Sequence, residues 1–440
     1  MDKGEKIKIV WLCHFSNQEV RDLLPLSKLQ FFNFIKKIIG KRKTIYVDFA
    51  PWINNLIKEF EKIENVELHI IAPHKGMKKS RTEFQLKGIY YHFFKAELLF
   101  PWNKLENIFN KKQQINFSRN RSFIKAFINH IQPDIVNLFG TENPYYSIAT
   151  LDIKDIPVFV SVQTVYSNPE TKKYEYKVET YRVDIEKQIH KKELYYGCAG
   201  RKYRDLILEN NPNAKIFKMF FPIQVPKKIS DVRKKYDFVF FAAAVTQIKG
   251  IEDAIDALEI VKKLFPKVLL DVVGSCNPNY KRELQKKIKE KQLDENIVFH
   301  DYFPLQTDMH LHIQQSNIAL LPIKLDIISG TVVEAMYLEL PIVTYKTYGT
   351  PYLNKNGDTV LLADIGDIQK LAENMLKLLT DVDFRNELSM KAKIFVETEL
   401  NNTVNAKRLV EDYKAVINHY YYRTPIPQSL LLDINEFPVY

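Results

Sequence analysis

The chain has 440 residues, long enough for two domains, each with its own apolar core. A composition of 46% hydrophobic and 27% charged residues argues against disorder, and three scattered cysteines argue against a disulfide framework or a zinc site. The net charge of +11 calls for an anionic partner: nucleic acid, an anionic membrane or a phosphorylated substrate.

The N-terminal half alternates predicted strands and helices, a pattern that favours a parallel α/β sheet. The predicted strands are 7–13, 66–72, 88–94, 135–139, 158–163 and 195–200, and the predicted helices are 52–62, 121–131 and 203–210.

Residues 220–235, with prolines and several lysines, interrupt this periodicity, and we place the domain linker at 223–235. The same alternation then restarts, with strands at 238–243, 268–273, 297–300, 318–322 and 342–345 and helices at 251–265, 280–291, 309–315, 330–338 and 367–380. The sequence therefore predicts two Rossmann-like, doubly wound α/β domains, 1–222 and 236–413, facing a central cleft. In such folds ligands bind at the carboxyl ends of the strands.

The first candidate for chemistry is Lys249, which follows the first strand of the second domain and precedes a helix in the segment 246–250. The free N–H groups of a helix N-terminus attract anions, so a lysine beside them is well placed to hold a diphosphate. A solvated lysine before a helix-opening glycine is the alternative.

The second candidate is the loop and helix of 320–336. The amides of Ser329, Gly330 and Thr331 would point at a phosphate, Glu334 would accept hydrogen bonds from a ribose diol, and Asp326 would bind sugar hydroxyls. The alternative is that Ser329 caps the helix and forms a capping pair with Glu334, which would carry no function.

Together these segments resemble the retaining glycosyltransferases of family 4 (glycosyl transferases group 1), which have the GT-B fold. The resemblance extends over about 236–379, and more loosely over 133–142 and 160–163, which look like segments of bacterial polysaccharide-building members. It is carried by Lys249-Gly250, Val272-Val273-Gly274, Leu321-Pro322, Asp326, Glu334-Ala335-Met336 and Leu340-Pro341-Ile342-Val343.

The resemblance implies that Lys249 binds the donor diphosphate, that Glu334 binds the ribose, and that Asp326 binds the transferred sugar; these three are the expected catalytic residues. The N-terminal domain would bind the acceptor, and residues 414–440 would pack back across it. Further donor contacts would come from Gly250, Gly274, Ile328, Ser329, Gly330 and Thr331, and acceptor or cleft contacts from Ser16, Asn17, Glu142 and Gln163.

This chain departs from the family pattern at several positions. Ala244 stands where an arginine is usual, so Arg201 or Lys202 is the candidate to supply the second cationic contact to the diphosphate. Asp326 replaces a glutamate and Ser329 a glycine, and many members have a histidine in place of Gln163.

The expected reaction moves a sugar, with retention, from a UDP- or GDP-linked donor to a glycan or lipid-linked acceptor in cell-surface polysaccharide biosynthesis. No cofactor and no metal is expected, because lysine and helix-end N–H groups would neutralise the leaving diphosphate. The alternatives are a GT-B-type nucleotide-sugar epimerase and a catalytically silent nucleotide-sugar-binding relative. Nucleic acid is not an expected partner, since no DNA- or RNA-binding module is recognisable.

A cytoplasmic location is expected, because no signal-peptide core and no long uncharged apolar stretch is found. Residues 23–39, followed by the basic triplet 41–43, have two open interpretations: an amphipathic helix on the anionic inner face of the plasma membrane, or a helix packed into the first domain. His310 and His312 are two residues apart, so no shared metal is expected, and both are placed at the surface or core edge.

Overall fold

The computed structural model describes residues 6–27, 46, 48–96, 116–169 and 178–437. The chain divides into two compact units. The first comprises Met1–Cys198, Tyr203–Pro222 and Asn402–Leu432, and the second comprises Ala199–Lys202, Ile223–Asn401 and Asp433–Tyr440.

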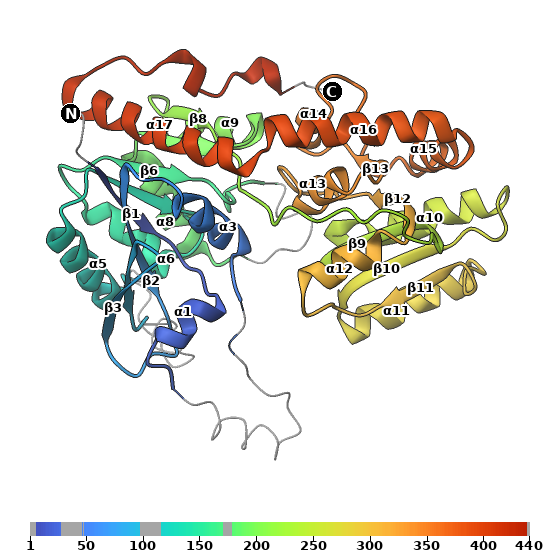
Figure 1. Ribbon diagram of the computed structural model, residues 1–440, viewed down its shortest axis with the longest axis horizontal. Coiled ribbons are helices and arrows are strands. Elements are labelled where there is room, and N and C mark those ends of the chain that lie inside the picture. The colour runs from blue at the N-terminus through green and yellow to red at the C-terminus, as the bar shows by residue number, and fades with distance from the viewer. Residues whose placement is uncertain (1–5, 28–45, 47, 97–115, 170–177, 438–440) are drawn as a thin grey trace. The chain divides into compact units, whose positions relative to one another are not determined.

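In its described part, the first unit has an eight-stranded sheet of order β3-β4-β2-β1-β5-β6-β7-β8 (Figure 1). All neighbouring strands are parallel except β3 and β4. The strands are β1 (Ile7–Leu12), β2 (Val66–Pro73), β3 (Arg81–Leu86), β4 (Ile89–Phe94), β5 (Ile135–Phe139), β6 (Val158–Ser161), β7 (Tyr195–Cys198) and β8 (Lys215–Lys218). The helices are α1 (Gln18–Leu23), α3 (Pro51–Phe60), α5 (Ser118–Ile131), α6 (Pro144–Ser147), α8 (Thr180–Lys192), α9 (Arg201–Asn210) and α17 (Asn402–Tyr422), with short 3-10 turns η1 (Ile148–Asp152) and η3 (Gln428–Leu430).

The second unit has a six-stranded sheet of order β11-β10-β9-β12-β13-β14, parallel throughout its described strands. Its strands are β9 (Tyr236–Val245), β10 (Leu270–Cys276), β11 (Ile297–His300), β12 (Ser316–Leu321), β13 (Ile342–Tyr345) and β14 (Leu361–Ala363). Its helices are α10 (Ile251–Lys262), α11 (Pro278–Glu290), α12 (Gln306–Ile313), α13 (Gly330–Tyr337), α14 (Thr350–Leu353), α15 (Ile368–Thr380) and α16 (Val382–Glu399), with 3-10 turns η2 (Gln247–Lys249) and η4 (Ile434–Glu436).

The predicted α/β architecture of two parallel-sheet units is confirmed. The central strands are buried on both faces, which explains why β9 and β12 read as continuous apolar runs. Each sheet has a topological switch point near its middle, where the strand order reverses. In the first sheet β1 lies between β2 and β5, and in the second β9 lies between β10 and β12. Loops that leave neighbouring strands at such a point diverge and leave room for a ligand.

Several parts of the fold differ from the sequence prediction. The edge of the first sheet is an antiparallel hairpin, whose turn residues Lys87 and Gly88 both have positive φ, as a tight two-residue hairpin turn requires. The helices α8, α16 and α17 were not predicted, because their apolar periodicity is weak.

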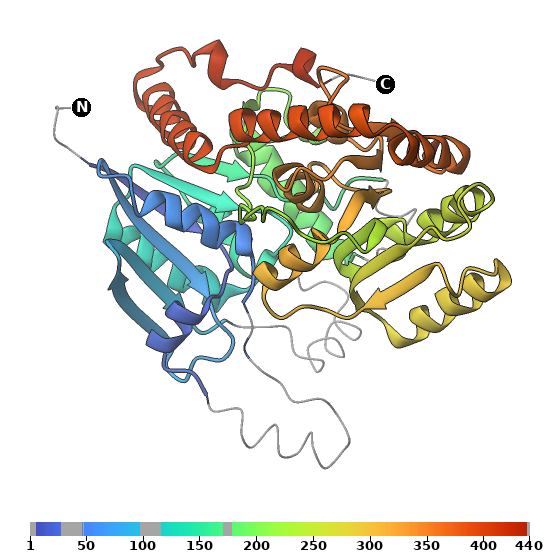
Figure 2. The ribbon, with the colours of Figure 1, turned by 45° about the vertical axis from the view of Figure 1, so that its right-hand side comes forward.

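The chain returns to the first unit at Asn402, whereas the sequence placed that return at residue 414. The physical reason is α17, which packs on α3 and buries Leu409, Val410 and Tyr413 in the core of the first unit (Figures 1 and 2). Residues 433–440 belong to the second unit, although the sequence assigned them to the first.

Candidate functional site

Two of the predicted donor residues, Lys249 and Asp326, lie on neighbouring loops at the switch point of the second unit. Lys249 ends the turn after β9, and Asp326 lies in the loop after the adjacent strand β12. Their side chains form an ion pair, with Lys249 Nζ 3.1 Å from Asp326 Oδ2. The two loops are also joined by the Lys324 amide, which donates to the Ile248 carbonyl at 2.9 Å. The structure therefore brings together the two residues expected to hold diphosphate and sugar.

Gly250 allows this close approach of the loops. It has a φ of +80°, and a Cβ at this position would lie 1.9 Å from the Pro322 carbonyl oxygen. Gly274, within β10, has a φ of +139°, and its Cβ would lie 2.0 Å from the Ala242 carbonyl oxygen. These two of the three predicted donor glycines thus have a steric reason to be glycine, which by itself does not require a ligand.

A buried polar network connects the loop after β12 to helix α10 and strand β13. Lys324 Nζ contacts Asp253 Oδ1 at 2.6 Å, and the Tyr345 hydroxyl donates to Asp253 Oδ2 at 2.8 Å. Burial, together with this hydrogen bond, raises the pKa of Tyr345. Asp253 lies in the first turn of α10, where the helix dipole stabilises a carboxylate.

The N-terminus of α13 does not have the capping pair of Ser329 and Glu334 that the sequence allowed as an alternative. Ser329 is the N-cap residue, but its side chain caps no backbone amide and instead contacts the Thr331 hydroxyl at 2.9 Å. Glu334 lies two residues beyond the position that a capping pair requires. Gln306 Nε2 donates to Glu334 Oε1 at 2.6 Å, and His310 Nε2 lies 3.5 Å from Glu334 Oε2.

These partners of Glu334 come from α12 and were not among the predicted site residues. Gln306 begins α12, and His310 lies about one turn later, so both side chains share one face of the helix. His310 is buried, which corrects its expected place at the surface or core edge. His312 points to other partners, described below.

The loop after β13 packs on the predicted sugar-binding loop. A Cβ on Gly349 would lie 1.8 Å from the Ile327 carbonyl oxygen, so only glycine permits this contact. Two predicted donor residues have neighbours within the second unit: Ile328 lies next to Gly349, and Gly330 lies next to Ile223.

The two candidates for a second diphosphate cation have structural partners. The guanidinium of Arg201 donates to the carbonyls of Ile434 (2.9 Å) and Phe437 (3.4 Å), which holds the C-terminal segment on the second unit. The Lys202 ammonium lies 5.7 Å from the centre of the Tyr348 ring. Ala244, in place of the usual arginine, is exposed at the end of β9.

The predicted acceptor residues of the first unit surround the start of α3. Oriented by its hydrogen bonds, the Gln163 amide donates to Glu142 Oε1 (2.9 Å) and accepts from Trp52 Nε1 (3.1 Å). Asn54, on the same helix, donates to the Ser16 carbonyl at 3.4 Å. It also accepts a hydrogen bond of 2.8 Å from the side chain of Asn17, the N-cap residue of α1.

Glu142 is the most perturbed carboxyl of this group. Burial, reinforced by the nearby Glu186 carboxylate, raises its pKa from 4.5 to about 8, so it carries a proton at neutral pH. Within the described part of the chain, its Oε2 is buried and has no hydrogen-bond partner. His14, two residues after β1, contacts the Tyr145 hydroxyl, and burial lowers the pKa of His14 to about 4.

Comparison with known proteins finds a family match within the second unit. Residues 224–395 match the family model for glycosyl transferases group 1. The amylovoran biosynthesis glycosyltransferase AmsK of Erwinia amylovora is 24% identical over 221 residues, 49% of this chain and 51% of that protein. The capsular polysaccharide biosynthesis glycosyltransferase CapM of Staphylococcus aureus is 22% identical over 182 residues, 40% of this chain and 46% of that protein. The matches thus span about half the length of these relatives.

Solved structures resemble the whole chain. Sucrose-phosphate synthase from Thermosynechococcus elongatus aligns with a TM-score of 0.65 and 12% identity, covering 93% of this chain and 98% of that one. Anabaena HepE in complex with UDP and glucose aligns with a TM-score of 0.61 and 13% identity, covering 93% of this chain and all of that one.

Among the residues that the structure describes, no helix combines the length and apolarity needed to span a bilayer. The basic segment 41–43 and most of 23–39 lie outside the described residues, so the membrane prediction has no structural counterpart here. The chain has the GT-B fold, and its segment 224–395 matches the family model for glycosyl transferases group 1.

Proposed function

We propose that this protein transfers a sugar from a nucleotide-diphosphate sugar to a glycan or lipid-linked acceptor, with retention, in cell-surface polysaccharide biosynthesis. The observation that carries the proposal is the meeting of Lys249, Asp326 and the α13 N-terminus at the switch point of a group 1 domain. The names of AmsK and CapM support the polysaccharide context, and the UDP and glucose bound to HepE support the donor class.

In this proposal Lys249 and the N–H groups that open α13 neutralise the diphosphate as it leaves. Glu334 accepts hydrogen bonds from the two ribose hydroxyls, and Gln306 and His310 hold its carboxylate in place. Asp326 exchanges its contact with Lys249 for the hydroxyls of the sugar. The donor site needs no metal cation, because the lysine and the helix amides supply the positive charge.

The transfer breaks the bond between the anomeric carbon and a diphosphate oxygen and forms a bond from the same face to the acceptor oxygen. The acceptor proton passes to the departing diphosphate, so no side chain is required as a general base. On the acceptor side, Gln163 fixes the orientation of the protonated Glu142 carboxyl, whose Oε2 is buried.

A thermal-shift panel of UDP, GDP, ADP and their common sugar conjugates tests the donor site, because a ligand that binds only the folded state raises the melting temperature. The variants are Lys249→Ala and Glu334→Ala, with Lys267→Ala, an exposed lysine of the same unit, as control. We expect one nucleotide series to stabilise the wild type and the control but neither site variant.

Slow hydrolysis of the identified donor, followed by NMR of the released sugar, then tests the chemistry. Retention predicts that the anomer released first has the configuration of the donor. Nucleotide binding without any hydrolysis or transfer would favour the silent relative, and formation of an epimeric nucleotide-sugar would favour the epimerase. No response to any nucleotide would overturn the proposal.

A further inference from the structure

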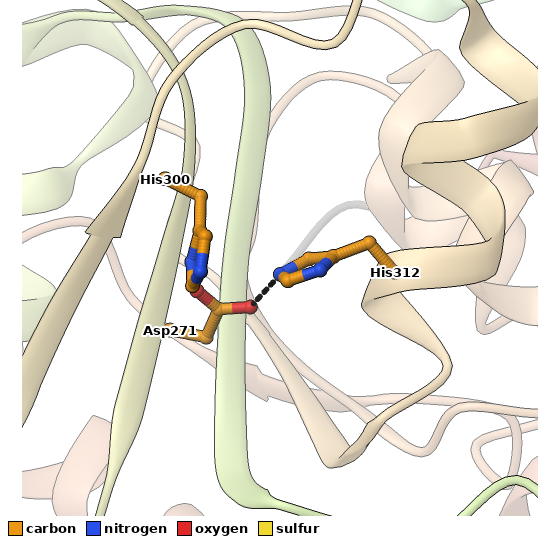
Figure 3. Close-up of side chains that lie close together, drawn as sticks. All are labelled: Asp271, His300 and His312. Atoms are coloured by element: carbon orange, nitrogen blue, oxygen red, sulfur yellow. Dashed lines mark hydrogen bonds and ion pairs between the residues drawn. The ribbon is translucent and has the colours of Figure 1, made fainter.

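Three side chains outside the donor site converge in the second unit (Figure 3). Asp271, near the start of β10, is fully buried. Its Oδ1 lies 2.6 Å from His300 Nδ1, and its Oδ2 lies 2.8 Å from His312 Nε2. The two imidazole rings lie side by side with their centres 4.4 Å apart.

The strand register explains why these residues meet. His300 ends β11 and is paired with Val273, two residues after Asp271 on the parallel strand β10. Residues two apart on a strand face the same side, so Asp271 and His300 share one face of the sheet. The contact of His312 with Asp271 places α12 on that face. The sequence offered one signal for this cluster: a carboxylate inside the apolar strand 268–273.

The charge of Asp271 needs compensation. A buried carboxylate is costly unless a cation or a metal ion is paired with it. In the part of the chain that the structure describes, the ion pairs of Asp271 are with these two imidazoles, and neither a lysine nor an arginine contributes. Aromatic rings of Tyr236 and Phe303 pack against the imidazoles and limit the access of water.

We propose that Asp271, His300 and His312 bind a divalent transition-metal ion, with Zn²⁺ as the first candidate. Two imidazole nitrogens and one carboxylate oxygen are a ligand set that such ions prefer. The three donor atoms already lie within 4.8 Å of one another. Ligands at about 2.0–2.1 Å from a tetrahedral ion are separated by roughly 3.3 Å, so the contacts of 2.6 and 2.8 Å would lengthen by about half an ångström when an ion enters.

The ion would have a structural role. It would tie α12 to β10 and β11, and α12 carries Gln306 and His310, the partners of Glu334. In the described part of the chain, His300 and His312 form no hydrogen bond with Lys249 or Asp326, so this metal site is separate from the proposed metal-independent donor site. The His300 side chain is 32% exposed, so solvent can reach the cluster from that side.

The test is a Co²⁺ titration of the metal-stripped full chain, because four-coordinate Co²⁺ absorbs visible light and substitutes for Zn²⁺. The variants are Asp271→Asn and His312→Gln, and the control is His130→Gln, which removes an exposed histidine of the first unit. We expect one Co²⁺ per chain in the wild type and the control, displaced by Zn²⁺, and at least tenfold weaker binding in both cluster variants. Circular dichroism checks that the variants are folded.

X-ray absorption of the Zn²⁺-loaded wild type gives a second result that needs no variant. The proposal expects two imidazoles and oxygen ligands around the ion. Sulfur ligands, which would indicate binding to one of the three cysteines, would overturn it. The absence of saturable Co²⁺ absorption in the wild type, or equal Co²⁺ affinity in the wild type and the cluster variants, would also overturn it.

Discussion

Lys249 Nζ lies 3.1 Å from Asp326 Oδ2, so the cation expected to bind the diphosphate is paired with the carboxylate expected to bind the sugar. Both side chains are 29% exposed, which makes this ion pair weak enough to exchange with a ligand. A nucleotide-sugar would satisfy both charges at once, whereas a nucleoside diphosphate alone would leave Asp326 without its partner.

The variant Asp326→Asn separates these two roles. Without the competing carboxylate, Lys249 is free for the phosphates, and we expect the affinity for the nucleoside diphosphate to rise by about two- to fivefold, the scale of a partly exposed ion pair. The affinity for the sugar conjugate should not rise in parallel, because a sugar contact is lost. Isothermal titration calorimetry with both ligands measures this, and a weaker binding of the nucleoside diphosphate would contradict it.

The variant Glu334→Ala tests the ribose contact. A hydrogen bond to a charged group contributes about 1.5–3 kcal/mol, so we expect a loss of roughly 10- to 150-fold in affinity for the ribonucleotide. A 2′,3′-dideoxy nucleotide has no diol to lose, and its affinity should be nearly the same in the variant and the wild type. Equal losses for both ligands would show that Glu334 acts on the fold of the site and not on the ribose.

Gly250→Ala should destabilise the second unit more than Gly357→Ala. Both glycines have a φ near +80°, which costs an alanine about 1–2 kcal/mol. Only at Gly250 would the added Cβ meet a backbone oxygen, that of Pro322, whereas the Cβ at Gly357 meets open space. Denaturant midpoints of the two variants compare the costs directly, and equal shifts would contradict the steric argument.

Glu142 should make the stability depend on pH. Its folded pKa of about 8 exceeds the ordinary 4.5, so between these values the unfolded chain releases a proton that the folded chain keeps. Stability therefore falls as pH rises through this window. Glu142→Gln removes the titration, and its melting temperature relative to the wild type should increase from about pH 5 to about pH 8.5. A difference that is constant with pH would refute the raised pKa.

Tyr413→Phe tests the return of α17 to the first unit. The Tyr413 hydroxyl accepts hydrogen bonds from Trp11 Nε1 (3.1 Å) and Asn137 Nδ2 (2.6 Å) in the core. The variant leaves two buried donors without an acceptor, which should cost about 2–4 kcal/mol. Tyr421→Phe, which removes an exposed hydroxyl bonded to the Asp155 carbonyl, is the control and should cost far less. Thermal denaturation of the two variants makes the comparison.

The sequence by itself determined the two α/β units, the loops that carry Lys249 and Asp326, and the helix that carries Glu334. Strand and helix periodicity is a local property, and the position of a residue after a strand can be read without knowing its neighbours in space. Sequence reasoning missed α17, because its apolar periodicity is weak, and it also missed the antiparallel hairpin of β3 and β4.

Only the tertiary structure decided which of these residues meet. Lys249 and Asp326 are 77 positions apart in the chain, and they pair because β9 and β12 are neighbours at a reversal of strand order. Arg201 also meets partners that are distant in the chain, because its guanidinium donates to the carbonyls of Ile434 and Phe437. The cluster of Asp271, His300 and His312 likewise depends on the register of β10 against β11 and on the packing of α12. Strand order, register and helix packing are set by long-range burial of apolar surface, which no local pattern encodes.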